Sequence, residues 1–117
     1  MQRSFRLTRS EDFKRVRRDG KSYAHPLVVL IALNNENNDQ LRVGVAAGKS
    51  VGTAVTRNRA KRLLREAMRS LLPNIASNSD LVLVARPTLA SATLADAQRA
   101  LENLLQRAKI LTPKHES

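Results

Sequence analysis

Residues 49–72, KSVGTAVTRNRAKRLLREAMRSLL, carry the clearest structural pattern in the chain. Apolar residues recur there at intervals of three and four, a spacing that places them on one face of an α-helix. We expect a helix over residues 53–72, ended by Pro73. Its buried face consists of Ala60, Leu63, Leu64, Ala67, Met68 and Leu71. Such a helix is stable when this apolar face packs against a second layer of structure.

The opposite face of the predicted helix is basic. On a helical wheel it groups Asn58, Arg62, Arg65 and Arg69, flanked near the amino end by Arg57, Arg59 and Lys61. A solvent-exposed face normally mixes both signs, because like charges four residues apart repel each other. Here only Glu66 offsets the positive charges, and arginine donates bidentately to phosphate oxygens. The pattern therefore favours a nucleic-acid surface, without distinguishing RNA from DNA.

The composition of the whole chain also favours a polyanionic partner. Its 117 residues include 21 Lys and Arg against 10 Asp and Glu, for a formal charge of +11. The excess is confined to residues 1–25 and 49–72, whereas charge that serves only solubility would be spread more evenly. The absence of cysteine excludes disulfides, thiolate zinc sites and cysteine nucleophiles.

No segment of the sequence is predicted to enter a membrane. The longest apolar run, residues 26–33, is much shorter than a spanning helix requires. The basic start MQRSFRLTRS is followed by no apolar stretch, unlike a secretory signal. We therefore expect a soluble, cytoplasmic protein with no membrane partner and no small-molecule substrate.

The amino-terminal segment predicts a short helix. Thr8 and Glu11 have the spacing of a capping box, in which each side chain satisfies a free backbone amide. The helix is expected over residues 9–18, with Gly20 as a stop in the left-handed conformation. Because its apolar content is low, Phe13 either fills a gap in the core or faces a groove.

Two strands are expected between this helix and residue 49. Residues 23–33 are rich in β-branched and aliphatic side chains and are typical of a strand, with Pro26 breaking its early part. The polar residues 34–40 are expected to form a loop that connects a hairpin. Residues 41–47 alternate in hydrophobicity and are predicted to be the returning strand.

The last third of the chain predicts one strand and one helix. Residues 80–86 form an apolar strand, and Thr93 with Asp96 opens the final helix. The apolar stripe of that helix is Leu94, Ala97, Leu101, Leu104, Leu105 and Ala108. Residues 112–117 are expected to be a frayed tail. The order of elements predicts an α+β fold, a single domain over residues 1–117 in which helices pack on a small sheet.

Residues 49–66 closely resemble the signature of the bacterial ribonuclease P protein subunit family. The family has a glycine, an Ala-Val pair, Arg-Asn-Arg, Lys-Arg and Arg-Glu at this spacing. These features match Gly52, Ala54-Val55, Arg57-Asn58-Arg59, Lys61-Arg62 and Arg65-Glu66. Further matches are Arg6-Leu7, Asp12-Phe13, Gly20, residues 41–45 and Ala85-Arg86, so the resemblance covers nearly the whole chain.

The resemblance implies a fold and an activity. The implied fold is a single RNA-binding domain over residues 1–117 with a small mixed sheet. It is an α/β sandwich like the second domain of ribosomal protein S5, with a left-handed βαβ crossover that composition alone would not suggest. The implied activity is that of a ribonucleoprotein endonuclease that removes the 5′ leader of precursor tRNA. In this family the RNA subunit and its Mg2+ ions catalyse the hydrolysis. The protein is implied to have no catalytic residue and no cofactor of its own, and to bind the RNA subunit and precursor tRNA.

The resemblance also implies which residues bind RNA. Those implied to contact the RNA subunit are Arg57, Asn58, Arg59, Lys61, Arg62, Arg65 and Arg69. Those implied to line a cleft for the leader are Phe13, Arg17, Ile31, Lys49 and Arg86. Better-known members of the family carry aromatic residues at the positions of Arg17 and Ile31. Arg17 could replace such an aromatic contact by a cation–π or phosphate contact.

Other motifs do not predict a site. Gly48-Lys49-Ser50 has the form of the end of a phosphate-binding loop, but that motif requires Gly where this chain has Val43. His25 and His115 have no partners at metal-ligand spacing, and no two carboxylates are spaced for acid–base catalysis. Two alternative functions remain open: an RNA-binding protein of similar fold outside any enzyme, and a protein nuclease, for which the sequence offers no metal site.

Overall fold

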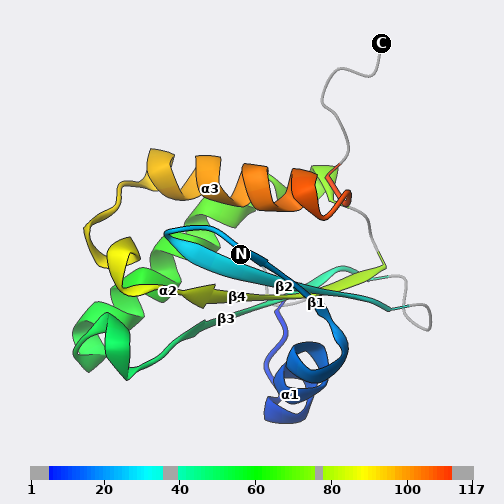
Figure 1. The fold of residues 1–117 in the computed structure, drawn as a ribbon, viewed down its shortest axis with the longest axis horizontal. Helices are drawn as coiled ribbons and strands as arrows, with labels where there is room; N and C mark the ends of the chain where they lie inside the picture. Colours follow the sequence, from blue (N-terminus) through cyan, green and yellow to red (C-terminus); the bar gives the residue numbers. More distant parts are fainter. Residues whose placement is uncertain (1–5, 36–39, 76–77, 112–117) are drawn as a thin grey trace.

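A computed structural model describes residues 6–35, 40–75 and 78–111 of the chain. Within these ranges the helices and strands are α1 (Ser10–Asp19), β1 (Lys21–Ala24), β2 (Val28–Asn34), β3 (Arg42–Ala47), α2 (Ala54–Arg69), β4 (Ser79–Ala85) and α3 (Leu94–Arg107). The strands form one sheet, with α1 against one face and with α2 and α3 against the other (Figure 1). The tail expected over residues 112–117 lies outside the described residues.

The strand order in the sheet is β1-β2-β4-β3. β2 pairs antiparallel with β1 and with β4, whereas β3 runs parallel to β4. β3, α2 and β4 therefore form a βαβ unit. The prediction that residues 34–40 connect a hairpin is wrong, because β4 lies between β2 and β3. β4 is buried along almost its whole length, and a strand that is apolar on both faces is stable in the interior of a sheet.

The segment expected to be one strand over residues 23–33 forms parts of two. β1 and β2 are antiparallel neighbours, and the chain reverses between them at His25 and Pro26. Proline has no N–H for a strand ladder, so this turn suits it. The His25 N–H donates to the Val28 carbonyl oxygen at 3.0 Å, and His25 Nδ1 accepts from the Leu27 N–H at 3.0 Å. His25 thus stabilises the turn.

The two longer helices begin where their sequences predict. The Thr53 side chain accepts a hydrogen bond from the first turn of α2 at 3.3 Å. Thr93 and Asp96 form the predicted capping box of α3, with both hydrogen bonds at 3.1 Å. α2 ends at Arg69, earlier than expected, because Pro73 has no N–H to donate to the Arg69 carbonyl. Among the described residues, no helix is long and apolar enough to cross a bilayer.

Both ends of α1 differ from the prediction. Arg9 precedes the helix and makes no side-chain capping bond, so the capping box of Thr8 and Glu11 is wrong. Gly20 follows the helix with φ −81°, so it is not a left-handed stop. A Cβ at Gly20 would lie 2.5 Å from the Val16 carbonyl oxygen and 2.9 Å from atoms of β2. Glycine is therefore required here because α1 and β2 approach each other closely.

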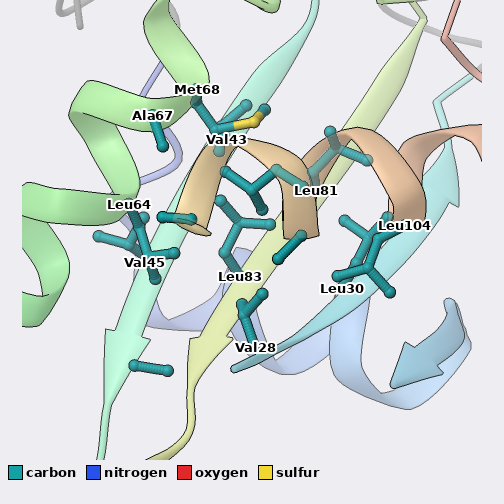
Figure 2. Packing of buried hydrophobic residues seen from close by; sticks show 14 of the residues in the cluster. Val28, Leu30, Val43, Val45, Leu64, Ala67, Met68, Leu81, Leu83 and Leu104 are labelled. Carbon is teal, nitrogen blue, oxygen red and sulfur yellow. The ribbon is translucent and has the colours of Figure 1, made fainter. Parts of the chain in front are cut away.

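The larger apolar cluster lies between the sheet and the helices α2 and α3 (Figure 2). Its members include Val28, Leu30, Val43, Val45, Leu81 and Leu83 of the sheet, Leu64, Ala67 and Met68 of α2, and Leu104 of α3. The predicted apolar face of α2 is buried except for Leu63, which is half-buried. In α3, Leu94 is 39% exposed, and Ala100, which the prediction omits, is buried. One face of α2 is thus held by the core, and the other remains accessible.

A smaller apolar cluster, here called the α1 cluster, lies on the other face of the sheet. It consists of Leu7, Val16, Ile31 and Val82. Phe13, Val29, Leu33 and Val84 pack against it and are half-buried. This cluster packs α1 against the face of the sheet opposite to α2 and α3.

Candidate nucleic-acid interface

The seven residues predicted to bind the RNA subunit all lie on α2, on the faces that the core leaves accessible. Asn58, Arg59, Arg62 and Arg69 are exposed, whereas Arg57, Lys61 and Arg65 are half-buried. We call these seven residues the α2 surface. Because they come from a single helix of 16 residues, their spacing is fixed by the helix itself. The surface is therefore preformed in the free protein.

Most cations of the α2 surface have no counter-ion within the described residues. Glu66 pairs with Arg69, with 3.1 Å between Oε2 and Nε. None of the other cations of this surface makes an ion pair or a hydrogen bond with the described part of the chain. The Nε of Arg57 is buried and meets no hydrogen-bond acceptor there. A buried donor without an acceptor lowers stability, so this surface suits an anionic partner.

Arg65 also carries a positive charge that no acid of the described residues neutralises. Burial of its guanidinium lowers its pKa, and the positive charges of Arg6 and Arg62 lower the pKa further. A lowered arginine pKa means that the charged form is less favourable at this position than in water. A bound anion would oppose both effects. The electrostatics of the free protein therefore favour a phosphate beside Arg65.

A second group of arginines, Arg15 of α1 and Arg42 of β3, is paired with an acid of the sheet. The buried Asp80 carboxylate accepts from Arg15 Nη2 at 2.7 Å and from Arg42 Nε and Nη2 at 3.1 and 3.0 Å. Asn35 Nδ2 donates to it at 3.1 Å. Burial alone would raise the pKa of Asp80, but these hydrogen bonds together lower it. The network joins α1 to the sheet and so fixes Phe13. The Asp80 network was not predicted from the sequence, although a lone acid at the start of an apolar strand is a signal for it.

One flank of α1 adjoins a half-buried apolar part of the sheet. Phe13 lies on this helix with Arg17 one turn later, and Arg17 is exposed. Val29 and Val84, which are paired across β2 and β4, are half-buried on the same face of the sheet. A Cβ at Gly44 would lie 2.5 Å from Phe13 Cζ, so glycine makes room for the ring. An aromatic ring and a cation beside an apolar floor suit unpaired nucleotides.

The other residues predicted for the leader cleft lie elsewhere. Ile31 is 7% exposed and belongs to the α1 cluster, so its side chain supports α1 from below. Lys49 and Arg86 are exposed and follow the carboxyl ends of β3 and β4. Because β3 and β4 are parallel, these two cations lie at one edge of the sheet. The structure thus places the five residues at three locations and not in one closed pocket.

A hollow of about 200 Å3 connects α1 with the α2 surface. It is lined by Arg6, Leu7, Thr8, Phe13, Val43, Gly44, Val45 and Arg65. The hollow therefore brings Phe13, predicted for the leader, close to Arg65, predicted for the RNA subunit. Arg6 was not among the predicted site residues. Two signals in the sequence point to Arg6: it lies in the basic segment 1–25, and it belongs to the Arg6-Leu7 match with the family.

The described residues do not form a metal site. Among them, no group of three or more His, Cys, Asp or Glu side chains could hold an ion. Asp80 and Asp12 both accept from Arg15, and Glu66 pairs with Arg69. His115 lies outside the described residues. The accessible groups of this interface include exposed arginines and the half-buried Phe13, and such groups can bind anions and bases.

Comparison with known sequences matches the chain to one family. The family described as Ribonuclease P matches residues 1–109. The ribonuclease P protein component of Clostridium novyi is 41% identical, over 92% of this chain and 96% of the relative. That of Herpetosiphon aurantiacus is 41% identical, over 94% of this chain and 89% of the relative.

Solved structures show the same architecture. The RNase P protein of Staphylococcus aureus is 31% identical and superimposes with a TM-score of 0.83, covering 94% of this chain and 100% of that chain. The RNase P protein of Thermotoga maritima is 29% identical with a TM-score of 0.77, covering 87% of this chain and 96% of that chain. The predicted α+β fold with a mixed sheet is confirmed by these structures.

Proposed function

Since the chain belongs to the ribonuclease P protein family, we propose that its basic surfaces hold the two RNAs of one enzyme. The chain is a protein component of ribonuclease P, an endoribonuclease holoenzyme that acts in tRNA 5′ processing. The α2 surface binds the RNA subunit, and the flank of α1 around Phe13 and Arg17 binds the leader of precursor tRNA. The row of cations on α2 without counter-ions in the described ranges carries this proposal.

The α2 surface matches an RNA backbone in length and in charge. Its helix of 16 residues is about 24 Å long, which is enough to meet several consecutive phosphates. Arg57, Arg62 and Arg65 make no ion pair with the described residues, so RNA displaces no internal partner from them. The Glu66–Arg69 pair is exposed, and an exposed pair is weak enough to exchange for a phosphate.

The α1 flank offers the leader both stacking and charge. Phe13 lies in the hollow with part of its ring accessible, and stacking of a base on such a ring contributes roughly 1–3 kcal/mol. Arg17 reaches a flanking phosphate from the next turn of α1. Lys49 and Arg86 continue the positive charge at the edge of the sheet. Ile31 acts indirectly, because it holds α1 in position.

We assign catalysis to the RNA subunit. Magnesium ions held by that RNA would supply the charge neutralisation that phosphodiester hydrolysis requires. No group of three or more His, Cys, Asp or Glu side chains among the described residues could hold a metal ion, and the proposal gives the protein no catalytic step. The protein contributes binding, since its cations neutralise phosphates of both RNAs. We place the enzyme in the cytoplasm, with no membrane partner and no small-molecule substrate.

The test adds the purified chain to a bacterial ribonuclease P RNA and precursor tRNA in low magnesium and measures leader removal. We expect the wild-type chain to restore cleavage and the Arg62→Ala/Arg65→Ala variant to lose this stimulation, because two phosphate contacts disappear. Arg99→Ala is the control for loss of an exposed arginine outside the α2 surface, since Arg99 lies on α3 and pairs there with Asp96. Circular dichroism should show all three proteins folded.

Two results would contradict the proposal. Tight RNA binding without restored cleavage would identify an RNA-binding protein that works outside the enzyme. Equal stimulation by the wild-type chain and the α2 double variant would show that the α2 surface does not contact the RNA subunit.

A further inference from the structure

The amino-terminal strand places Arg6 beside α2. Arg6 forms a parallel bridge with Val43 at the outer edge of β3, and the Leu7 N–H donates to the Val43 carbonyl oxygen at 2.9 Å. The Leu7 side chain is 3% exposed and belongs to the α1 cluster. Arg6 is thus held by backbone pairing and by an apolar anchor in the next residue. The backbone that carries the Arg6 side chain is therefore fixed beside β3.

The hollow described above lies between Arg6 and Arg65. Both residues line it, together with Thr8 and Phe13. Gly44 forms part of its wall, and a larger residue there would meet the Phe13 ring. The hollow has a volume of about 200 Å3, which gives room for one phosphate group beside the edge of one base.

The two arginines of the hollow repel each other in the free protein. The positive charge of Arg6 contributes to the lowered pKa of Arg65, after the larger effect of burial. No carboxylate pairs with Arg6 or Arg65 within the described ranges. Arg15 gives the contrast, because it is also half-buried and binds Asp80 at 2.7 Å. Two guanidinium groups held on one hollow without an anion form a site for an anion.

We propose that Arg6 and Arg65 clamp one phosphodiester group of single-stranded RNA, with the adjoining base against Phe13. This inference rests on the proposed function and deepens it, because it adds Arg6 and joins the α2 surface to the α1 flank. The strand is single-stranded, since a base inside a duplex cannot reach an aromatic ring in a hollow of this size. The phosphate belongs to the RNA subunit or to the precursor tRNA leader, and the experiment separates these two sources.

The experiment measures two affinities for the Arg6→Ala, Arg65→Ala and double variants. The first is the affinity of the chain for the RNA subunit alone, and the second is the affinity of the assembled holoenzyme for precursor tRNA. We expect each single substitution to weaken one of these affinities about tenfold, because a charge-assisted hydrogen bond is lost. A loss in the first assigns the phosphate to the RNA subunit, and a loss in the second alone assigns it to the leader. Arg99→Ala again serves as the control of equal charge change.

Coupling between the two arginines distinguishes a clamp from two independent contacts. If both bind the same phosphate, the double variant should lose much less than the product of the two single effects. A plot of log K against log salt should also be less steep for the double variant than for the wild type. The difference in slope should be about 0.7, the value for one phosphate on a single strand. Multiplicative losses with a slope change of about 1.4 would overturn the clamp.

The same measurements separate failure of this inference from failure of the proposed function. If the wild-type chain stimulates the RNA subunit but Arg6→Ala behaves like Arg99→Ala, the clamp is wrong and the proposed function stands. If the wild-type chain neither binds nor stimulates the RNA subunit, the proposed function fails and the clamp fails with it. Circular dichroism of each variant excludes unfolding as the cause of a loss.

Discussion

The two groups of arginines in this protein differ in what neutralises them. Arg15 and Arg42 share the buried carboxylate of Asp80 beneath α1, whereas Arg62 and Arg65 on α2 have no ion pair within the described residues. The first group has its counter-charge inside the chain and stabilises the fold. In the proposed function, RNA supplies the counter-charge of the second group. The location of the counter-charge, and not the number of cations, therefore separates the structural arginines from those proposed to bind RNA.

The largest effect on stability should come from Asp80→Asn. This substitution removes the charge that neutralises Arg15 and Arg42, and loss of one partner of a buried pair costs about 3–5 kcal/mol. We expect about 3 kcal/mol, because both arginines remain partly exposed. Urea denaturation measures the free energy of unfolding. Asp19→Asn is the control, since the Arg18–Asp19 pair is exposed and its loss should change the free energy of unfolding far less. Equal effects of the two substitutions would contradict the structural role of Asp80.

The next effect should be that of Phe13→Ala on substrate discrimination. If a leader base stacks on the ring, affinity for precursor tRNA should fall about tenfold, and affinity for mature tRNA should change little. Filter binding with the holoenzyme measures both. Val16→Ala is the matched control, because Val16 is buried in the same cluster and cannot contact RNA. Equal losses for the two tRNAs would assign Phe13 to the core alone.

Low pH should lower the stability of the protein, because protonation of Asp80 removes its ion pairs with Arg15 and Arg42. The pKa of Asp80 in the folded chain lies below its ordinary value of 3.8, so its contribution to stability is fully present above that value and is lost as the pH falls through the folded pKa. We expect the unfolding free energy of the wild type to fall more steeply below about pH 4 than that of Asp80→Asn. Denaturation curves at pH 7 and at pH 3 measure this difference. Parallel pH profiles would show that the network does not depend on the Asp80 charge.

The smallest effect should be that of α2 substitutions on stability. Arg62→Ala removes a cation with no partner in the described part of the chain, so the free energy of unfolding should change by less than about 0.5 kcal/mol. Arg65→Ala also removes repulsion from Arg6 and Arg62 and should be neutral or slightly stabilising. Urea denaturation without RNA measures both. A large destabilisation by either would place that residue in the structural group.

The elements that depend on local pattern were predictable from the sequence. The apolar period of α2, the basic residues opposite it and the capping box of Thr93 and Asp96 follow from spacings of three and four residues. Each pattern is complete within one helix, so no knowledge of distant contacts is needed. The family resemblance identified the fold for the same reason, because its longest motif lies within residues 49–66.

Features that depend on distant contacts were not predictable. The position of β4 between β2 and β3 is set by pairing across the whole sheet, and local alternation does not report it. The Asp80 network joins residues more than thirty positions apart, and Arg6 reaches Arg65 only because the chain start pairs with β3. The left-handed conformation predicted for Gly20 is wrong because a close approach of two elements also requires glycine, and the sequence does not separate these two causes. The assignment of individual residues to RNA contacts stays a prediction.

The salt dependence of binding between this chain and a ribonuclease P RNA tests the central claim most directly. If the six cations of the α2 surface contact about six phosphates, affinity should fall roughly 10³-fold between about 50 and 200 mM salt. The Arg62→Ala/Arg65→Ala variant should show a shallower slope than Arg99→Ala. An affinity that does not change with salt, or equal slopes for these two variants, would contradict an interface made by the α2 surface with RNA phosphates.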